Sequence, residues 1–187
     1  MKKTGIPTYW FALLTALGTV GCGAEGVENA GGPNQPVEQS EHALTWRTLH
    51  GSSAGTKVTT GENYLLGYQL RSGSWIDQLK IVGYYGYKAG PFGGGGGSDQ
   101  GYHQCNTGDT IVGMYGYANA SYVTQLGFIC GVYSTGATYD LPAGGQPTGT
   151  PFRDVCPAKQ SLDALQVYYG TYVNGIVAGC GVPIVIL

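Results

Sequence analysis

The sequence is poor in charge and in histidine, which argues against several classes of protein. Only 11% of the 187 residues are charged, and three are histidine. With Lys2 and Lys3 of the N-terminal segment set aside, seven basic side chains remain against eleven acidic ones, a net charge of −4. Nucleic-acid binding depends on a basic face. The composition therefore excludes nucleic acid as the expected partner.

Long amphipathic patterns are also missing. Outside the N-terminal segment no stretch shows the 3.6-residue period of a helix, whereas the chain contains 34 glycines and 15 tyrosines. Tyrosine is enriched in β-strands, where its side chain packs on the pleated surface of the sheet. We therefore expect an all-β fold.

The apolar run at the start is too short to span a membrane. Residues 10–17 follow Lys2 and Lys3 and end in small residues, which is the pattern of a secretory signal peptide over residues 1–21. The protein is therefore expected to be exported.

The end of this signal carries a second feature. Thr19-Val-Gly-Cys22 resembles the lipobox of bacterial lipoproteins, in which the cysteine becomes the lipidated first residue. The resemblance implies lipidation of Cys22 and, with Gly23 after it, anchoring in an outer membrane. Ordinary cleavage just beyond Cys22, which would give a freely secreted protein, is the alternative. In either case the only expected membrane contact is a lipid anchor.

The rest of the chain divides into a tether and one domain. Residues 22–43 are rich in Gly, Pro and Glu and contain almost nothing that could enter a core. Residues 44–187 have the usual length of one domain with a single core.

Four cysteines remain after Cys22, an even set for an oxidising compartment. Cys105 and Cys130 are 25 residues apart, and Cys156 and Cys180 are 24 apart. The equal spacing predicts the disulfides Cys105–Cys130 and Cys156–Cys180. A zinc site is the rival interpretation, but the sequence has no CxxC pair. We expect neither a metal nor a cofactor.

The equal spacing reflects an internal repeat. Three segments align, each with a strand, a Gly/Ser/Asn turn, an aromatic residue and a second strand: 65–82, 111–130 and 162–180. Alternation in the second strands predicts these buried positions: Leu79, Ile81, Leu126, Phe128, Ile176 and Ala178. In the first segment Thr59 and Gly83 stand where the other two have cysteines. With repeats at about 44–89, 90–138 and 139–187, three such units can form one domain around a common axis.

Two stretches carry a family resemblance. Leu70-Arg-Ser-Gly-Ser-Trp-Ile-Asp-Gln-Leu79 is similar to the GRSGxYLDAI stretch of jacalin-related lectins, and Gly90-Pro-Phe-Gly-Gly-Gly-Gly-Gly97 resembles their GPWGGNGG segment. The resemblance implies a three-sided β-prism of three Greek-key-like four-stranded sheets with a pseudo-threefold repeat. In the lectins the Gly-rich segment comes first, whereas here it follows the Gly-x-x-x-Asp turn. That order is expected of a circular permutation.

The resemblance also implies a sugar site between the turn and the Gly-rich loop. Carried over residue by residue, the sugar-binding residues are Gly73, Ser74, Trp75, Asp77, Gly95 and Gly96. A carboxylate can accept hydrogen bonds from two neighbouring hydroxyls, and glycines let a pyranose approach the main chain. Trp75 and the later tyrosines Tyr84, Tyr85 and Tyr87 offer faces for stacking. Alternatively, Asp77 only caps its turn and the Gly-rich run is only a flexible loop.

The other two repeats depart from the motif. The second has Ala120 and Thr124 in place of the glycine and aspartate, and the third keeps Gly170 but has Asn174. Gly170 and Asn174 are a candidate second site, with Gly144-Gly145 or the preceding unit's loop as its Gly-rich companion.

An enzyme is not expected. No histidine stands in a recognisable arrangement with a nucleophile and an acid, and only Asp77 with Asp99 could be proposed as a glycosidase pair. Two hypotheses remain. The first is a metal-independent lectin-like module that binds glycans. The second is a structural or protein-interaction domain of the cell envelope that has lost the sugar.

Overall fold

The computed structural model describes residues 43–61, 65–132 and 134–182. The predicted signal peptide, Cys22 and nearly all of the predicted tether lie outside these residues. The described chain is almost entirely β, with one 3₁₀ turn at Tyr84–Gly86 as its single helical element. No helix in this part of the chain is long and apolar enough to cross a membrane.

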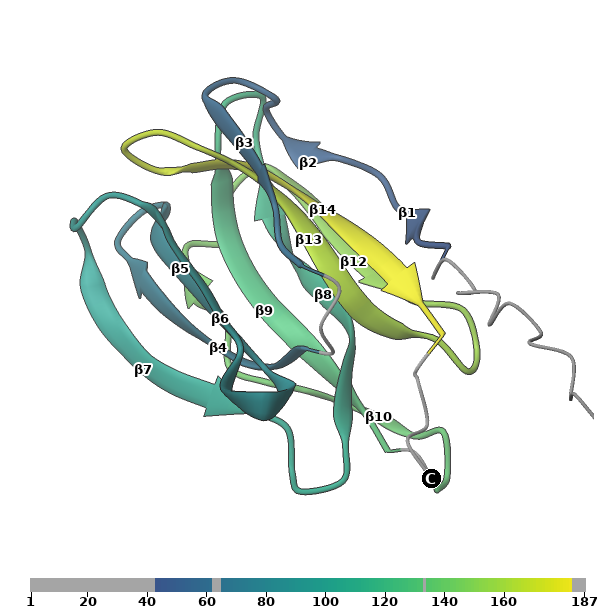
Figure 1. Ribbon diagram of the computed structural model, residues 1–187. Helices are drawn as coiled ribbons and strands as arrows, with labels where there is room; N and C mark the ends of the chain where they lie inside the picture. Colours follow the sequence, from purple (N-terminus) through teal and green to yellow (C-terminus); the bar gives the residue numbers. More distant parts are fainter. Residues whose placement is uncertain (1–42, 62–64, 133, 183–187) are drawn as a thin grey trace, which may run out of the picture. The chain divides into compact units, whose positions relative to one another are not determined.

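The strands form three antiparallel sheets (Figure 1). Sheet B contains four consecutive strands: β4 (Leu65–Ser72), β5 (Ile76–Gly83), β6 (Lys88–Gly93) and β7 (Ser98–Gln104). Sheet C contains the next five: β8 (Thr110–Ala118), β9 (Val123–Gly131), β10 (Thr138–Asp140), β11 (Gly144–Gly145) and β12 (Thr150–Val155). Sheet A joins both ends of the described chain: β1 (Thr45–Trp46), β2 (His50–Gly51), β3 (Thr56–Thr59), β13 (Ser161–Tyr169) and β14 (Val173–Gly181).

All three sheets have one topology. The order is β6-β5-β4-β7 in sheet B and β10-β9-β8-β12 in sheet C, so the fourth strand returns to lie beside the first, as in a Greek key. Sheet A has the order β1-β14-β13-β3. In sheets A and C one edge is shared by two short strands, because β1 and β2 both pair with β14, and β10 and β11 both pair with β9. Each sheet therefore has four strand positions, as expected for the β-prism.

The sheets are offset from the repeats that the sequence suggests. Sheet B spans residues 65–104 and sheet C residues 110–155, while sheet A combines residues 161–181 with residues 45–59. The sequence repeats follow the central hairpins, which are local in the chain. Hydrogen bonding to a central hairpin decides which sheet an edge strand joins. In sheet A the edge strands β1, β2 and β3 come from the opposite end of the domain.

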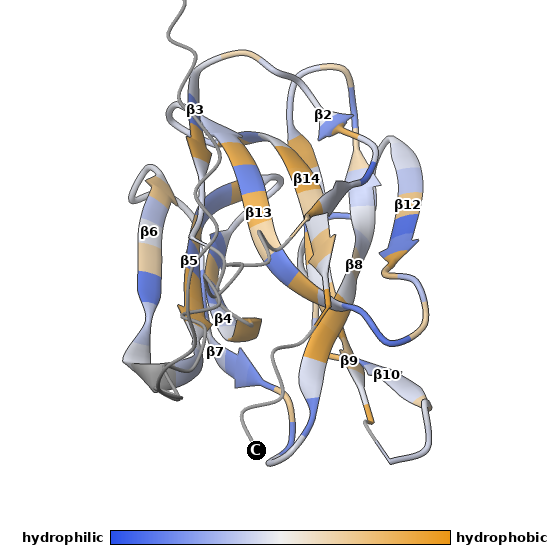
Figure 2. Cartoon of the chain, turned by 45° about the vertical axis from the view of Figure 1, so that its right-hand side comes forward, coloured by the Kyte–Doolittle hydropathy of each residue, from blue (hydrophilic) through white to orange (hydrophobic). Residues whose placement is uncertain are grey.

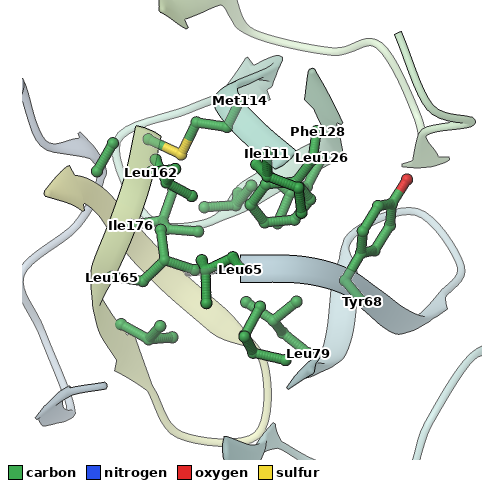
Figure 3. Close-up of a cluster of buried hydrophobic side chains, with 14 of the residues drawn as sticks. Leu65, Tyr68, Leu79, Ile111, Met114, Leu126, Phe128, Leu162, Leu165 and Ile176 are labelled. Atoms are coloured by element: carbon green, nitrogen blue, oxygen red, sulfur yellow. The ribbon is translucent and has the colours of Figure 1, made fainter. Parts of the chain in front are cut away.

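One core lies between the three sheets. The six second-strand positions predicted to point inward are all buried, with at most 1% of any side chain exposed. Figure 3 shows side chains of all three sheets meeting there, among them Leu79, Leu126 and Ile176. Figure 2 shows apolar residues alternating with polar ones along the strands, the pattern of sheets with one buried face.

The two disulfides connect consecutive sheets. Cys105 directly follows β7 of sheet B and is bonded to Cys130 in β9 of sheet C. Cys156 directly follows β12 of sheet C and is bonded to Cys180 in β14 of sheet A. The pairing is the one that the equal spacing predicts.

The third junction, between sheets A and B, is held differently. After β3, the N–H of Gly61 donates to the Tyr87 hydroxyl over 2.7 Å, and the N–H of Gly83 in β5 donates to the Tyr87 carbonyl over 2.9 Å. Thr59, which the sequence alignment places opposite the cysteines, is an exposed strand residue. The neighbouring residue, Thr60, is buried, and the side-chain oxygen of Thr60 accepts a hydrogen bond from the N–H of Leu165.

Candidate functional site

The predicted turn and the Gly-rich loop lie against each other in sheet B. The turn joins β4 to β5, and the loop joins β6 to β7. Asp77, the second residue of β5, is only 7% exposed. Its carboxylate oxygen Oδ2 accepts the N–H of Gly73 over 3.0 Å, and its main-chain carbonyl accepts the N–H of Gly94 over 2.9 Å. The two motifs of the sequence therefore meet at one aspartate.

Glycine is required in this loop because the chain passes so close to Asp77. Gly93 has φ of +104°, and a Cβ on it would lie 2.1 Å from the Asp77 carbonyl oxygen. Gly97 has φ of +62°, and its Cβ would lie 2.5 Å from Oδ2 of Asp77. Gly96 has an ordinary φ, but its Cβ would lie 2.4 Å from Oδ1. Around Gly95 there is no protein atom within 4 Å of the Cβ position.

Two polar side chains of the same sheet hold the loop in place. The Arg71 guanidinium donates to the carbonyls of Gly96 (2.9 Å) and Gly97 (2.8 Å). The Gln78 amide donates to the Gly94 carbonyl over 3.0 Å. These hydrogen bonds hold the loop beside the Asp77 carboxylate.

Several strong hydrogen-bonding groups at this site have no protein partner. Among the described residues, Oδ1 of Asp77 accepts no hydrogen bond, and the N–H groups of Ser74, Gly95 and Gly96 donate none. Ser74, Gly95 and Gly96 are exposed. One carboxylate oxygen and several main-chain donors suit a ligand that both donates and accepts, such as a polyhydroxylated one.

An aromatic cluster stands beside the turn. Trp75 lies 5.2 Å from Tyr122 and 5.0 Å from Tyr172, measured between ring centroids, and the two tyrosines lie 5.3 Å apart. The three rings come from the three central hairpins, one from each sheet. In Figure 1 these hairpin turns lie toward the upper left. Trp75 is therefore part of a cluster that the three sheets build together.

The later tyrosines named with Trp75 lie elsewhere. Tyr84, Tyr85 and Tyr87 follow the far end of β5, whereas Asp77 is near its start. An eight-residue strand is about 25 Å long, because each residue rises by roughly 3.3 Å. Nearness in the sequence was misleading here, since the strand carries the chain away from the turn.

The candidate second site has a companion loop other than Gly144-Gly145. The preceding unit's loop meets the same turn where the N–H of Gly94 donates to the Thr171 carbonyl over 2.9 Å. The Asn174 amide Nδ2 donates to the carbonyl of Ala54 over 2.9 Å, and the N–H of Ser52 donates to the Asn174 carbonyl over 2.8 Å. Gly170 and Asn174 therefore face the loop Gly51–Gly55 of sheet A. Gly144 and Gly145 instead lie in sheet C, where a Cβ on Gly145 would lie 2.1 Å from the Thr124 carbonyl.

The three sheets thus repeat one loop as well as one turn. Each loop begins and ends with a glycine of positive φ, four residues apart: Gly93 and Gly97, Gly51 and Gly55, Gly145 and Gly149. The turn residue opposite is Asp77, Asn174 and Thr124 respectively. Thr124 is fully buried, and its hydroxyl donates to the carbonyl of Thr148 in its own loop. In sheet B, Asp77 keeps one carboxylate oxygen without a partner among the described residues. In sheet A, the Asn174 amide nitrogen is hydrogen-bonded to its loop. In sheet C, the Thr124 hydroxyl is hydrogen-bonded to its loop.

His103 and the two acidic residues nearest to it in sequence, Asp99 and Asp109, have separate partners. The His103 ring contacts the Gln100 carbonyl at 3.0 Å, Asp99 accepts from the Gln69 amide at 2.8 Å, and Asp109 accepts from the Tyr139 hydroxyl at 3.0 Å. The Gln69 and Gly101 hydrogen bonds hold the pKa of Asp99 below its usual value. Within the described ranges there is no cluster of three His, Cys, Asp or Glu residues that could hold a metal ion.

No protein-family model matches the sequence, and a search of curated proteins gives no match. Solved structures do match. Wild-type Malaysian banana lectin has a TM-score of 0.60 at 19% identity, over 74% of this chain and 98% of that lectin. A mannose-binding jacalin-related lectin from Ananas comosus has a TM-score of 0.58 at 25% identity, over 75% and 98%. A mannose-specific jacalin-related lectin from Morus nigra, solved in complex with mannose, has 0.60 at 16%, over 74% and 95%.

The similarity shows the class of fold. The described domain is a jacalin-like β-prism, the fold of those lectins, and it spans nearly their whole length. The sequence-level resemblance to the jacalin-related lectins and the three-dimensional similarity therefore agree on the architecture.

Proposed function

We propose that the protein is an exported, metal-independent lectin that binds sugar hydroxyls at Asp77. The observation that carries this proposal is the free carboxylate oxygen of Asp77, which lies beside Gly96 where a Cβ would clash at 2.4 Å. Gly73 orients the other oxygen. A sugar hydroxyl can donate to Oδ1 while its neighbours accept from the N–H groups of Ser74, Gly95 and Gly96.

Trp75 completes the proposed site. Its side chain is half-buried in the aromatic cluster, which fixes its orientation two residues from Asp77. An aromatic face packs well against the C–H groups of a pyranose. Mannose is the first sugar to test, because two of the structural neighbours are mannose lectins by name.

Gly170 and Asn174 form a proposed second, weaker site. Asparagine can hydrogen-bond a hydroxyl through its carbonyl oxygen but lacks the charge of Asp77, and its Nδ2 is engaged by Ala54. A charged acceptor makes hydrogen bonds roughly twice as strong as a neutral one. We therefore propose that the Asp77 site in sheet B binds sugar more tightly than the Gly170 and Asn174 site in sheet A.

The order of turn and loop has a simple explanation. In sheet B the turn precedes the loop, as a circular permutation of the lectin order would produce. In sheet A the loop Gly51–Gly55 precedes the turn at Gly170, which is the order of the lectins. Internal threefold repetition accounts for both orders in one chain, without a permutation.

The proposed setting is the cell surface. Two disulfides suit an oxidising compartment, and we propose that Cys22 carries a lipid anchor or that the domain is released by cleavage near it. A lectin held by a tether gains strength from multivalency, because monosaccharide affinity is on the order of millimolar.

A second candidate function is protein interaction in the cell envelope without sugar. The closed loop of sheet C and the Asn174 substitution favour it, since two of the three loop–turn pairs have lost the carboxylate.

Titration with mannose and a glycan array, each with wild type and Asp77→Ala, test the proposal. We expect millimolar binding that Asp77→Ala weakens at least tenfold. Asp140→Ala is the matched control, because it removes an exposed carboxylate paired with Arg153 on sheet C, and it should bind as wild type does. The absence of any glycan signal, or a signal indifferent to Asp77→Ala, would overturn the proposal and favour the envelope-interaction alternative.

A further inference from the structure

A groove crosses the outer face of sheet B, on the side away from the core. It has a volume of about 530 Å³, within the usual range of small-ligand sites, about 300 to 1,000 Å³. Its lining includes Gln69, Lys80, Val82, Lys88, Pro91 and Tyr102. None of these residues belongs to the Asp77 site, its loop or its turn.

The strand register explains why these side chains share one face. Tyr102 of β7 pairs with Gln69 of β4, and Gln69 pairs with Lys80 of β5, so the three stand in one row. Val82 lies two residues after Lys80 and pairs with Lys88 of β6. Side chains two apart on a strand, and those directly opposite on its partner, point to the same face. The groove therefore runs across the sheet from β7 over β4 and β5 to β6.

One wall of the groove depends on a glycine. Tyr102 is 47% exposed, and its ring lies over Gly67, where a Cβ would come within 2.6 Å of the Tyr102 hydroxyl oxygen. With no side chain on Gly67, the tyrosine leans along the sheet and presents an aromatic face. Pro91 provides a second apolar surface on the β6 side.

The groove is cationic in a protein that is acidic overall. Lys80 and Lys88 line it, and no Asp or Glu does. Among the described residues neither lysine makes an ion pair. The Asp99 carboxylate, which does not line the groove, takes hydrogen bonds from Gln69 and Gly101, and its charge interacts with those of Arg71 and Lys80. Lysine stems cover apolar surface while their ammonium groups remain at its edge.

We propose that this groove is a second, independent binding site for a carboxylate-bearing sugar chain. Ring carboxylates of consecutive uronic-acid residues pair with Lys80 and Lys88, and a sugar C–H face packs on Tyr102. The charge complementarity selects an acidic over a neutral chain. Four of the lining residues, Lys88–Pro91, belong to the edge strand β6, but the lining extends across β5 and β4 to Tyr102 on β7, so a ligand that fills the groove lies across the face of the sheet.

The test is titration of the protein with tetragalacturonate and with a neutral tetrasaccharide of the same length. We expect the acidic chain to bind more tightly than the neutral one and to weaken as salt is raised, because exposed charges are screened. The double variant Lys80→Gln/Lys88→Gln should lower the affinity for tetragalacturonate at least tenfold. Tyr102→Ala should lower it several-fold without changing the salt dependence.

Two controls separate this site from general charge and from the Asp77 site. Lys57→Gln removes an exposed lysine on β3 of sheet A and should change the affinity less than twofold. Asp77→Ala should leave tetragalacturonate binding intact even if it abolishes mannose binding. Equal binding of the neutral chain, no binding of the acidic one, or an equal loss in Lys57→Gln would overturn the proposal, whatever the outcome at Asp77.

Discussion

At the scale of the residue, the site depends on glycines, because their lack of a side chain lets the loop approach Asp77. The Asp77 carboxylate is oriented by the N–H of Gly73 and is approached by loop positions where a Cβ would clash with it. Gly96 and Gly95 are adjacent in that loop but differ in this respect. Gly96 faces Oδ1 of Asp77, whereas Gly95 has open space around it.

This difference leads to a prediction for alanine at each position. Gly96→Ala should push the Asp77 carboxylate aside and weaken sugar binding at least tenfold. Gly95→Ala should leave Asp77 in place, so that any loss of affinity there comes from the ligand's approach alone. Neither residue has a positive φ. The free energy of unfolding of each variant should therefore lie within about 1 kcal/mol of the wild-type value.

Mannose titration together with urea unfolding measures both effects. If Gly96→Ala bound mannose as well as wild type, Asp77 would not be the acceptor at the site.

At the scale of the element, the central hairpin is the repeated unit. Each hairpin supplies the buried second strand and the turn of its loop–turn pair. The sequence repeats could be recognised because both features lie within about twenty residues. Two disulfides and the Tyr87 hydrogen bonds then join the sheets in pairs.

Removing one disulfide tests how much each junction contributes. Each bond spans 24 or 25 residues, and the chain-entropy relation gives about 3.5 kcal/mol for such a loop. Cys156→Ser/Cys180→Ser and Cys105→Ser/Cys130→Ser should each lower the free energy of unfolding in urea by about that amount. A loss below about 1 kcal/mol would show that the sheets are held mainly by packing.

The junction without a disulfide offers a comparison. Tyr87→Phe removes the hydroxyl that accepts the N–H of Gly61. We expect a loss of about 1 kcal/mol in urea unfolding, the usual net contribution of one hydrogen bond. Tyr117→Phe, on β8 of sheet C, is the control, because its hydroxyl makes no hydrogen bond with the described residues, and it should have a smaller effect. A loss as large as that of a disulfide variant would mean that Tyr87 does more than accept this one hydrogen bond.

At the scale of the whole molecule, one buried tyrosine connects sheet B to sheet C, and a half-buried tyrosine of sheet C donates to the neighbouring carbonyl. The Tyr68 ring from sheet B is fully buried, and its hydroxyl points away from the apolar cluster in Figure 3 to donate to the Pro142 carbonyl in the chain of sheet C. The Tyr115 hydroxyl donates to the adjacent Leu141 carbonyl over 2.6 Å. Burial, with the nearby Tyr115, raises the pKa of Tyr68 far above its usual value, and burial also raises the pKa of Tyr115.

These pKa shifts predict a loss of stability at alkaline pH. Above pH of about 10 the unfolded chain ionises its tyrosines, whereas the folded protein keeps Tyr68 protonated. The stabilisation is therefore complete below pH 10 and declines as the pH rises through the tyrosine range. Tyr68→Phe should make the free energy of unfolding fall less steeply between pH 9 and 11, although the variant is less stable at pH 7.

Urea unfolding at several pH values measures this slope. An unchanged slope in Tyr68→Phe would mean that Tyr68 ionises equally in both states.

The sequence by itself determined the class of the protein and its local parts. Low charge, abundant glycine and tyrosine and the alternation of the second strands predict an all-β domain. Equal cysteine spacing predicts both disulfides. The Gly73–Asp77 turn and the Gly-rich loop could be recognised because each is a short continuous motif.

Only the tertiary structure decided which loop faces which turn. Asn174 meets a loop 120 residues earlier in the chain, and Trp75 meets tyrosines from two other hairpins. Such contacts follow from closing three sheets around one core, and no local pattern encodes them. For the same reason, the tyrosines that follow Trp75 in sequence were placed wrongly at the site. The groove on sheet B could not be predicted either, because it depends on the pairing of four strands.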